Sequence, residues 1–100
     1  MAEINTIVMP KWGLAMQEGM VAAWNVEVGD QISKGQEIMD IETSKITNAF
    51  ESPASGKLRR KLVDVGETVP VGALLGVVAD DSIADDEIDA FVTGFRASFA

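Results

Sequence analysis

The sequence contains no cysteine and no histidine. Disulfide staples, thiolate metal sites, Cys/His nucleophiles and a Ser/His/Asp triad are therefore excluded. The sequence also lacks a phosphate-binding loop and a paired nucleophile and base, so it offers no catalytic residue, no metal ligand and no sign of a free-standing enzyme. The lack of cysteine fits a reducing compartment, and we expect a cytoplasmic protein. No signal peptide and no membrane-spanning segment are expected, because no long apolar run is present.

Basic residues are also scarce. Eight lysines and arginines stand against 16 aspartates and glutamates, which gives a formal net charge of -8 at pH 7. Because phosphates repel an acidic surface, we expect no nucleic-acid partner and no binding to anionic membranes. The 100 residues, 47% of them hydrophobic, suffice for one compact domain, which we expect to be monomeric in isolation.

Residues 1–80 contain no long uninterrupted segment. Glycines and prolines divide them into short pieces rich in Val, Ile and Leu, which predicts an all-β sandwich or barrel. Residues 20–28 alternate and predict one apolar row on one face, formed by Met20, Ala22, Trp24, Val26 and Val28, with Trp24 in the core. The predicted strands are 4–9, 20–28, 36–41, 46–50, 58–65 and 73–79.

An internal repeat with constant spacing joins two halves of this region. It aligns Gly19 with Gly56, Gly29 with Gly66 and Gly35 with Gly72, and Val and Ile positions between the glycines match as well. Glycines at matched positions indicate matched turns, since a left-handed backbone conformation favours glycine. The repeat therefore predicts a sandwich with pseudo-twofold symmetry.

Residues 81–100 have a different character. Ala84, Ile88, Phe91, Phe95 and Phe99 recur at helical spacing, with acidic residues early in the segment and Arg96 late. Ser82 and Asp85 resemble a capping box. We leave two alternatives open, a short amphipathic helix outside the sandwich and an acidic linker. The domain boundaries that we predict are 1–80 and 81–100.

The candidate site lies where the two halves meet. An apolar segment ends at Ile41 and another begins at Ile46, so the residues between them predict a tight polar hairpin that contains Lys45. A lysine that carries a covalent group must protrude from a rigid base, and this position meets that requirement. The alternative is an unmodified surface lysine, since most lysines are only solvated charges.

Several motifs resemble the lipoyl domains of the acyltransferase (E2) subunits of 2-oxo acid dehydrogenase complexes. They are residues 9–19 (MPKWGLAMQEG), 28–30 (VGD), 34–35 (KG), 41–45 (IETSK), 51–53 (ESP), 55–56 (SG), 65–66 (VG) and 70–72 (PVG). The resemblance covers residues 4–80. It implies a barrel-sandwich hybrid of two four-stranded sheets with pseudo-twofold symmetry. The first loop, with the sequence KWGL at residues 11–14, is most similar to the lipoyl domains of acetoin dehydrogenase systems. The acidic tail at residues 85–90 (DDEIDA) is similar to those proteins as well.

The resemblance implies that lipoic acid is attached as an amide to Lys45. It also implies that Glu42, Thr43, Ser44 and Ile46 form the turn recognised by the lipoate-attaching enzyme. In that family the lipoyl group accepts an acyl group, acetyl in the acetoin systems, from a thiamine diphosphate-dependent E1. The acyl group passes to coenzyme A at an E2 catalytic domain, and a flavin-dependent E3 reoxidises the dithiol. The chain would be a non-catalytic carrier that precedes a further domain. The first loop, 10–16, would lie near the lysine turn, with Lys11 and Trp12 as recognition contacts for E1.

Two departures from the family pattern and several alternatives remain. Ser44 replaces the usual Asp before the lysine, and the tail is not an Ala/Pro-rich linker. The alternatives are a lipoyl domain of a pyruvate or other 2-oxo acid complex, a biotin carrier, whose lysine is typically flanked by methionines, and an unmodified structural adaptor. Lys57, Arg59 and Lys61 alternate on one predicted strand. We interpret this basic row as a solvated face, with a docking face for an acidic partner as the alternative.

Overall fold

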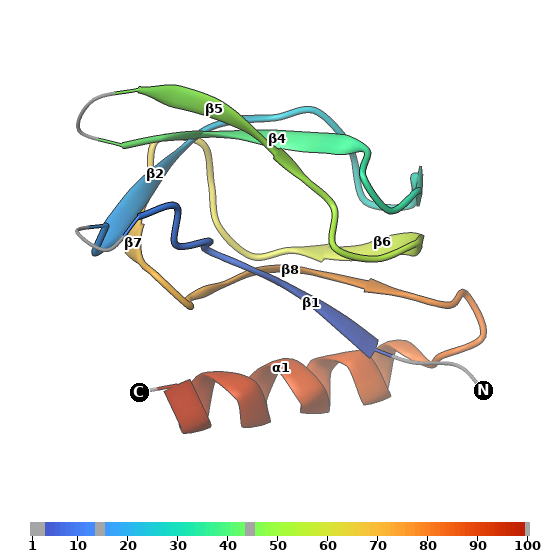
Figure 1. Ribbon diagram of the computed structural model, residues 1–100. Coiled ribbons are helices and arrows are strands. Elements are labelled where there is room, and N and C mark those ends of the chain that lie inside the picture. The colour runs from blue at the N-terminus through green and yellow to red at the C-terminus, as the bar shows by residue number, and fades with distance from the viewer. Residues whose placement is uncertain (1–3, 14–15, 44–45, 100) are drawn as a thin grey trace.

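The computed structural model describes residues 4–13, 16–43 and 46–99. Two four-stranded antiparallel sheets face each other, and one helix lies against the outside of one sheet (Figure 1). The first sheet has the order β1-β8-β6-β3 and the second has the order β5-β4-β2-β7. The elements are β1 (Ile4–Val8), β2 (Glu18–Trp24), β3 (Gln31–Ile32), β4 (Glu37–Glu42), β5 (Thr47–Glu51), β6 (Gly56–Lys61), β7 (Thr68–Pro70), β8 (Leu74–Ala79) and α1 (Asp85–Phe99). The predicted barrel-sandwich fold is confirmed.

The pseudo-twofold symmetry is confirmed as well. When β1–β4 are exchanged for β5–β8, one sheet order becomes the other. The bulge between Val21 and Ala23 in β2 has its counterpart between Leu58 and Arg60 in β6. Two equivalent backbone hydrogen bonds link the halves: Gly29 N donates to the Leu58 carbonyl at 2.8 Å, and Gly66 N donates to the Val21 carbonyl at 2.7 Å. The repeat therefore extends from strand order to individual hydrogen bonds.

Equivalent glycines make equivalent turns. Gly29 and Gly66 have φ values of 99° and 95°, which an L side chain rarely adopts. They are the turn glycines expected from the repeat. The short strands β3 and β7 follow these turns. They are absent from the predicted strands, because two or three residues are too few to show alternation.

The core lies between the two sheets. Its members come in symmetry-related pairs, such as Val21 with Leu58 and Ile38 with Leu75, all of them buried. The predicted row from Met20 to Val28 is correct in part, because Val26 is buried in the core and Trp24 packs against it, but Val28 is 56% exposed. The β2 bulge changes the alternation, so Val21, which lies outside the predicted row, is a core residue. Trp24 packs against the margin of the core and donates its Nε1–H to the Val63 carbonyl at 2.8 Å.

The C-terminal segment forms the helix, not a linker. The Ala84 carbonyl accepts hydrogen bonds from the backbone N–H groups of Glu87 and Ile88, so the helical ladder begins there. Ser82 donates its backbone N–H to the Asp80 carboxylate at 2.8 Å. The capping box suggested by Ser82 and Asp85 is therefore not the arrangement found in this described segment. No helix in the described part of the chain is long and apolar enough to span a membrane.

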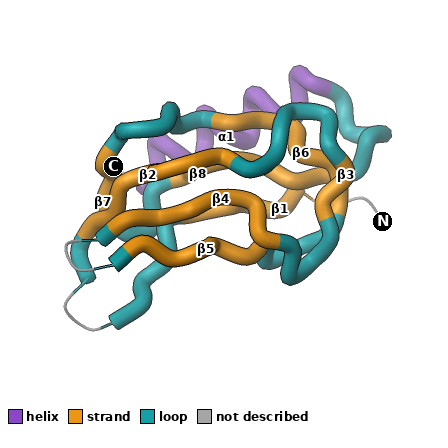
Figure 2. The backbone as a smooth tube through the Cα atoms, turned by 90° about the horizontal axis from the view of Figure 1, so that it is seen from above, coloured by secondary structure: helices purple, strands orange, loops and turns teal. Residues whose placement is uncertain are grey.

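Helix α1 covers the outer face of β8. Ile88 and Val92 are buried against Leu74, Val77 and Ala79. In the other half, the positions equivalent to these three β8 residues are occupied by Glu37, Asp40 and Glu42 of β4, of which Glu37 and Glu42 are exposed and Asp40 half-buried. The helix runs from the end of the sandwich where β1 begins toward the end where β4 meets β5 (Figures 1 and 2).

Candidate functional site

The turn between β4 and β5 is closed by backbone hydrogen bonding. Glu42 pairs with Thr47 across the hairpin. Thr43 N donates to the Ile46 carbonyl at 2.8 Å, and Thr43 Oγ1 donates to the same oxygen at 3.2 Å. Ser44 and Lys45, the two residues between them in the sequence, lie outside the described residues. The two ends of the turn are thus fixed to each other immediately before and after this pair.

The residues that flank the pair differ in their surroundings. Ile46 is 55% exposed, although it is a large apolar residue. Glu42 is exposed and accepts a hydrogen bond from Thr47 Oγ1 at 3.5 Å, so its described contact is within the hairpin. Thr43 is half-buried, and its backbone N–H and hydroxyl both donate to the Ile46 carbonyl. These contacts make Glu42 and Thr43 turn-shaping residues and leave Ile46 as an apolar side chain available to a partner.

The described part of the first loop is anchored close to β4. A Cβ atom on Gly19 would lie 2.8 Å from Met9 Sδ, 3.0 Å from Ile41 Cγ2 and 3.2 Å from Met16 Cε. The two flanks of the loop therefore pack over Ile41, the last buried residue of β4 before the turn. Glycine leaves room for this packing, since a side chain at position 19 would have to displace the ends of Met9 and Met16.

Trp12 places the loop beside β5. Its ring meets Phe50 edge to face, with ring centroids 6.3 Å apart and planes at 84°. Its backbone N–H donates to Met16 Sδ at 3.3 Å. Trp12 is 41% exposed, and Lys11 is exposed. The structure therefore brings Trp12 to the strand that leaves the lysine turn, in line with the expected position of the first loop. Sequence reasoning missed Phe50, which gave no signal beyond its place in a predicted strand.

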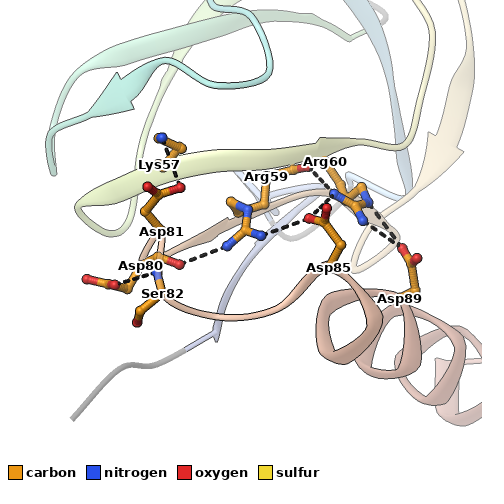
Figure 3. Close-up of polar contacts among 8 residues, drawn as sticks. All are labelled: Lys57, Arg59, Arg60, Asp80, Asp81, Ser82, Asp85 and Asp89. Atoms are coloured by element: carbon orange, nitrogen blue, oxygen red, sulfur yellow. Dashed lines mark hydrogen bonds and ion pairs between the residues drawn. The ribbon is translucent and has the colours of Figure 1, made fainter.

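The basic row on β6 includes Arg59, which with its neighbour Arg60 faces the acidic start of α1 (Figure 3). Arg59 Nη2 lies 2.8 Å from Asp85 Oδ1, and Arg60 Nη2 lies 2.9 Å from Asp89 Oδ1. Arg59 is only 8% exposed and also donates to the Asp80 carbonyl at 2.8 Å. The two neighbouring lysines form ion pairs as well, Lys57 with Asp81 and Lys61 with Glu27. The interpretation of this row as a solvated face is wrong for Arg59, which is buried against the end of β8 and the start of α1. Lys57 and Lys61 stay partly exposed and pair with exposed carboxylates.

Two carboxyl groups in this cluster have lowered pKa values. The hydrogen bond from Arg59, followed by the charge of Arg60, holds the pKa of Asp85 below its ordinary value. Hydrogen bonds from the side chain and backbone of Ser82 lower the pKa of Asp80. Both shifts favour the ionised carboxylates. They belong to the attachment of the helix and not to a catalytic pair.

The described residues do not assemble a catalytic or metal centre. Within 4–13, 16–43 and 46–99, no group of three acidic, His or Cys residues could hold a metal ion. What the geometry provides is a nearly symmetric β-sandwich, with the β4–β5 hairpin joining its two halves. The class of protein that this fold defines is a two-sheet β-sandwich built from two similar half-domains.

The comparisons with known proteins agree with this class. Residues 5–78 match the biotin and lipoyl family, whose family model is described as that of a biotin-requiring enzyme, and the chain belongs to this family. The chain is 52% identical over 99 residues to the dihydrolipoyllysine-residue acetyltransferase component of the acetoin cleaving system of Pseudomonas putida, covering 99% of this chain and 27% of that protein. The resemblance seen in the sequence is thereby confirmed.

A second relative has the same printed name. The component from Cupriavidus necator is 52% identical over 93 residues, covering 93% of this chain and 25% of that protein. The chain thus spans about a quarter of the length of these relatives. Among solved structures, a single-chain, multi-domain long-chain acyl-CoA carboxylase matches 88% of this chain and 8% of its own with a TM-score of 0.62. At 19% identity that likeness concerns the fold alone.

Proposed function

We propose that this chain is the lipoyl carrier domain of an acetoin-type dihydrolipoamide acetyltransferase, with lipoic acid attached to Lys45. The observation that carries the proposal is the hairpin closed by Thr43 and Ile46, because the sequence between them contains Lys45. The support from relatives is the 52% identity over nearly the whole chain to two acetoin cleaving components.

The described residues fit a lysine that carries a lipoyl amide. An attaching enzyme must surround the turn, and the exposed Ile46 beside it gives that enzyme an apolar contact. Glu42 is the nearest acidic residue in the sequence, and its contact with Thr47 directs it into the hairpin. Glu42, Thr43, Ser44 and Ile46 are the residues that we assign to recognition by the lipoate-attaching enzyme.

When bound as an amide on Lys45 Nζ, lipoate supplies acyl transfer and redox chemistry, linking a thiamine diphosphate-dependent E1, an E2 catalytic domain that uses coenzyme A and a flavin-dependent E3. The protein contributes the position of the attachment lysine and of the first loop. The flanks of the first loop pack around Gly19 beside Ile41 of β4, and the hydrogen bond from Thr43 to Ile46 closes the hairpin that follows β4. Lys11 and Trp12 are the residues that we assign to contact with E1, since both are exposed and Trp12 lies against Phe50 of β5.

The proposal is tested by intact mass after incubation with lipoate, ATP and a lipoate ligase. The parent chain should gain one lipoyl group and Lys45→Ala none. Lys34→Ala is the matched control, because Lys34 is an exposed lysine that also lies in a tight turn. A parallel incubation with biotin and a biotin ligase separates the two cofactors of the family. Modification by biotin alone, or of neither kind in a folded chain, would overturn the proposal.

The acyl group needs a separate assay. The lipoylated chain, with its dithiolane in the oxidised disulfide form, is offered to the E1 of an acetoin system and to the E1 of a pyruvate dehydrogenase complex, each with its own substrate, and the reductive acetylation that opens the disulfide is followed by mass. We expect acetylation to be faster with the acetoin E1. Faster acetylation by the pyruvate E1 would keep the carrier role and reject the acetoin assignment.

A further inference from the structure

Strand β5 forms one margin of its sheet. It pairs with β4 on one side, and among the described residues no strand pairs with its other side (Figure 2). An edge strand presents unpaired backbone N–H and C=O groups, to which an extended segment of another chain can bind. Proteins protect such edges by making them short, by placing proline or lysine on them, or by covering them. Strand β5 has five residues (TNAFE), with neither proline nor lysine among them.

The other edge strands differ from β5. Strand β3 has two residues and β7 has three, with Pro70 among them, so neither edge can pair over any length. Strand β1 has five residues, of which Ile4 and Val8 pack against the cluster formed with α1. In β5 the equivalent positions are Thr47 and Glu51, and both are exposed. Of the two five-residue edge strands in the described chain, β5 is therefore the more accessible to a partner.

The hairpin register determines which backbone groups of β5 point outward. The bond from Thr43 N to the Ile46 carbonyl makes these two residues a hydrogen-bonded pair. Hydrogen-bonded and non-hydrogen-bonded pairs alternate along an antiparallel ladder. Counting from this first pair, Thr47 and Ala49 fall in non-hydrogen-bonded pairs with β4. Their backbone N–H and C=O groups therefore point away from β4, toward the open edge.

A shallow hollow lies along this edge. Its volume is about 430 Å³, and it is lined by Trp12, Asn48, Ala49, Phe50 and Glu51. Trp12 stands on the side of the first loop, 41% exposed and in edge contact with Phe50. The lining thus combines an aromatic ring with an amide, a carboxylate and backbone groups. This mixture suits a polypeptide segment, because a peptide brings polar backbone groups and side chains together.

Charge favours a basic segment. The ionisable residues in the strands of this sheet are all acidic: Glu18, Glu37, Asp40, Glu42 and Glu51. Glu37 and Glu51 lie opposite each other in β4 and β5, and like charges at opposed positions are destabilising. Within the described residues neither forms an ion pair. A lysine or arginine side chain beside Glu51 offsets this repulsion, and the ring of Trp12 offers the same cation a second contact.

We propose that the edge of β5 binds an extended, basic peptide segment of a partner protein as an added strand. The backbone of the segment bonds to Thr47 and Ala49. A lysine or arginine side chain of the segment lies between the Trp12 ring and the Glu51 carboxylate. This binding requires no group on Lys45, so the inference is independent of the proposed carrier function.

Hydrogen exchange tests the added strand directly. The unlipoylated chain is labelled with ¹⁵N and titrated with an acetylated hexapeptide of alternating lysine and valine. When about nine-tenths of the chain is bound, exchange of the Thr47 and Ala49 amides should slow about tenfold, because only the free fraction exchanges. The amides of Asn48 and Phe50 alternate with these along β5 and point toward β4, so their exchange should change less than about twofold.

The two tryptophans report the position of the peptide. We expect the indole N–H signal of Trp12 to shift during the titration. The Trp24 signal should stay in place, because its Nε1–H is bonded to the Val63 carbonyl. Trp12→Phe assigns the two signals.

Matched variants separate backbone pairing from charge. Ala49→Pro removes an outward N–H and should weaken peptide binding about tenfold, and a hexapeptide N-methylated at alternate residues should show the same loss with the parent chain. Glu51→Gln should weaken binding about two- to fivefold, the effect of an exposed ion pair. Glu67→Gln is the control, because Glu67 is an exposed acid beside β7, at the opposite edge of the same sheet, and binding should not change.

Three results would overturn the inference. The first is no binding at about 10 mM peptide, a concentration at which even a millimolar Kd gives a largely bound chain. The second is binding that leaves exchange at Thr47 and Ala49 unchanged. The third is equally tight binding of a hexapeptide of alternating glutamate and valine. Because none of these results depends on lipoate, each leaves the proposed function of Lys45 standing.

Discussion

Ile88→Ala tests whether α1 is an integral part of the domain. Ile88 is fully buried and packs in the cluster that joins the helix to β8. Truncation of a buried Ile to Ala costs about 2–5 kcal/mol in well-packed cores. Because α1 lies on the outside of the sandwich and can settle toward β8, we expect a loss of about 2–3 kcal/mol in the free energy of unfolding.

The loss is measured by urea denaturation, with thermal unfolding as a second probe. In a domain of this size, a loss of about 2–3 kcal/mol lowers Tm by roughly 10–20 °C. Alanine has the highest helix propensity, so the loss reports packing and not helix formation. Thr93→Ala is the matched control, because Thr93 is exposed on the same helix. The control should stay within about 0.5 kcal/mol of the parent chain.

If Ile88→Ala unfolds at the same urea concentration as Thr93→Ala, the reasoning is refuted. The helix would then contribute nothing to the stability of the sandwich, and the outer face of β8 would not depend on its cover. A biphasic transition in the parent chain would also refute it, since α1 would then undock before the sandwich unfolds.

Three further substitutions test separate features. Asp85→Asn should lower Tm at pH 7. Because the folded pKa of Asp85 lies below its ordinary value, its contribution is present above that ordinary value of about 4 and is lost as the pH falls through the folded pKa, so the difference in Tm from the parent chain should shrink progressively in acid. Gly76→Ala should destabilise by about 1–3 kcal/mol in urea denaturation, since its Cβ would lie 2.8 Å from the Arg60 carbonyl of the neighbouring strand; an unchanged midpoint would contradict that packing. Gly94→Ala should stabilise by about 0.5–1 kcal/mol, since nothing lies within 4 Å of its Cβ position and alanine favours the helix; a lower Tm would refute the open space inferred there.

The symmetric part of the fold was predictable because the repeat reports it directly. Matched glycines such as Gly29 and Gly66 mark equal turns, and equal turns with equal apolar positions build equal half-domains. The alternation in β2 misled the strand prediction for a physical reason. A bulge adds a residue to one strand of a pair, so the side chains beyond Val21 change faces without any mark in the sequence.

The candidate site was predictable in part. The turn between Ile41 and Ile46 follows from the polar residues between two apolar segments, and its closing bonds at Thr43 agree with that reading. The contact between Trp12 and Phe50 was not predictable. It joins residues far apart in the sequence across a loop, and no periodicity connects them. This contact is therefore a property of the folded chain alone.

The position of α1 was missed, although the repeat contains a signal for it. In two symmetric halves, equivalent outward positions have the same surroundings unless something covers one of them. Glu37, Asp40 and Glu42 on β4 correspond to Leu74, Val77 and Ala79 on β8. Apolar residues where the other copy has carboxylates mean that the β8 face is covered, and the adjacent amphipathic segment is the element available to cover it. The same logic explains the basic row on β6. Arg59 and Arg60 correspond to Ala22 and Ala23 on the uncovered sheet, and they pair with Asp85 and Asp89 of α1, the element that breaks the symmetry.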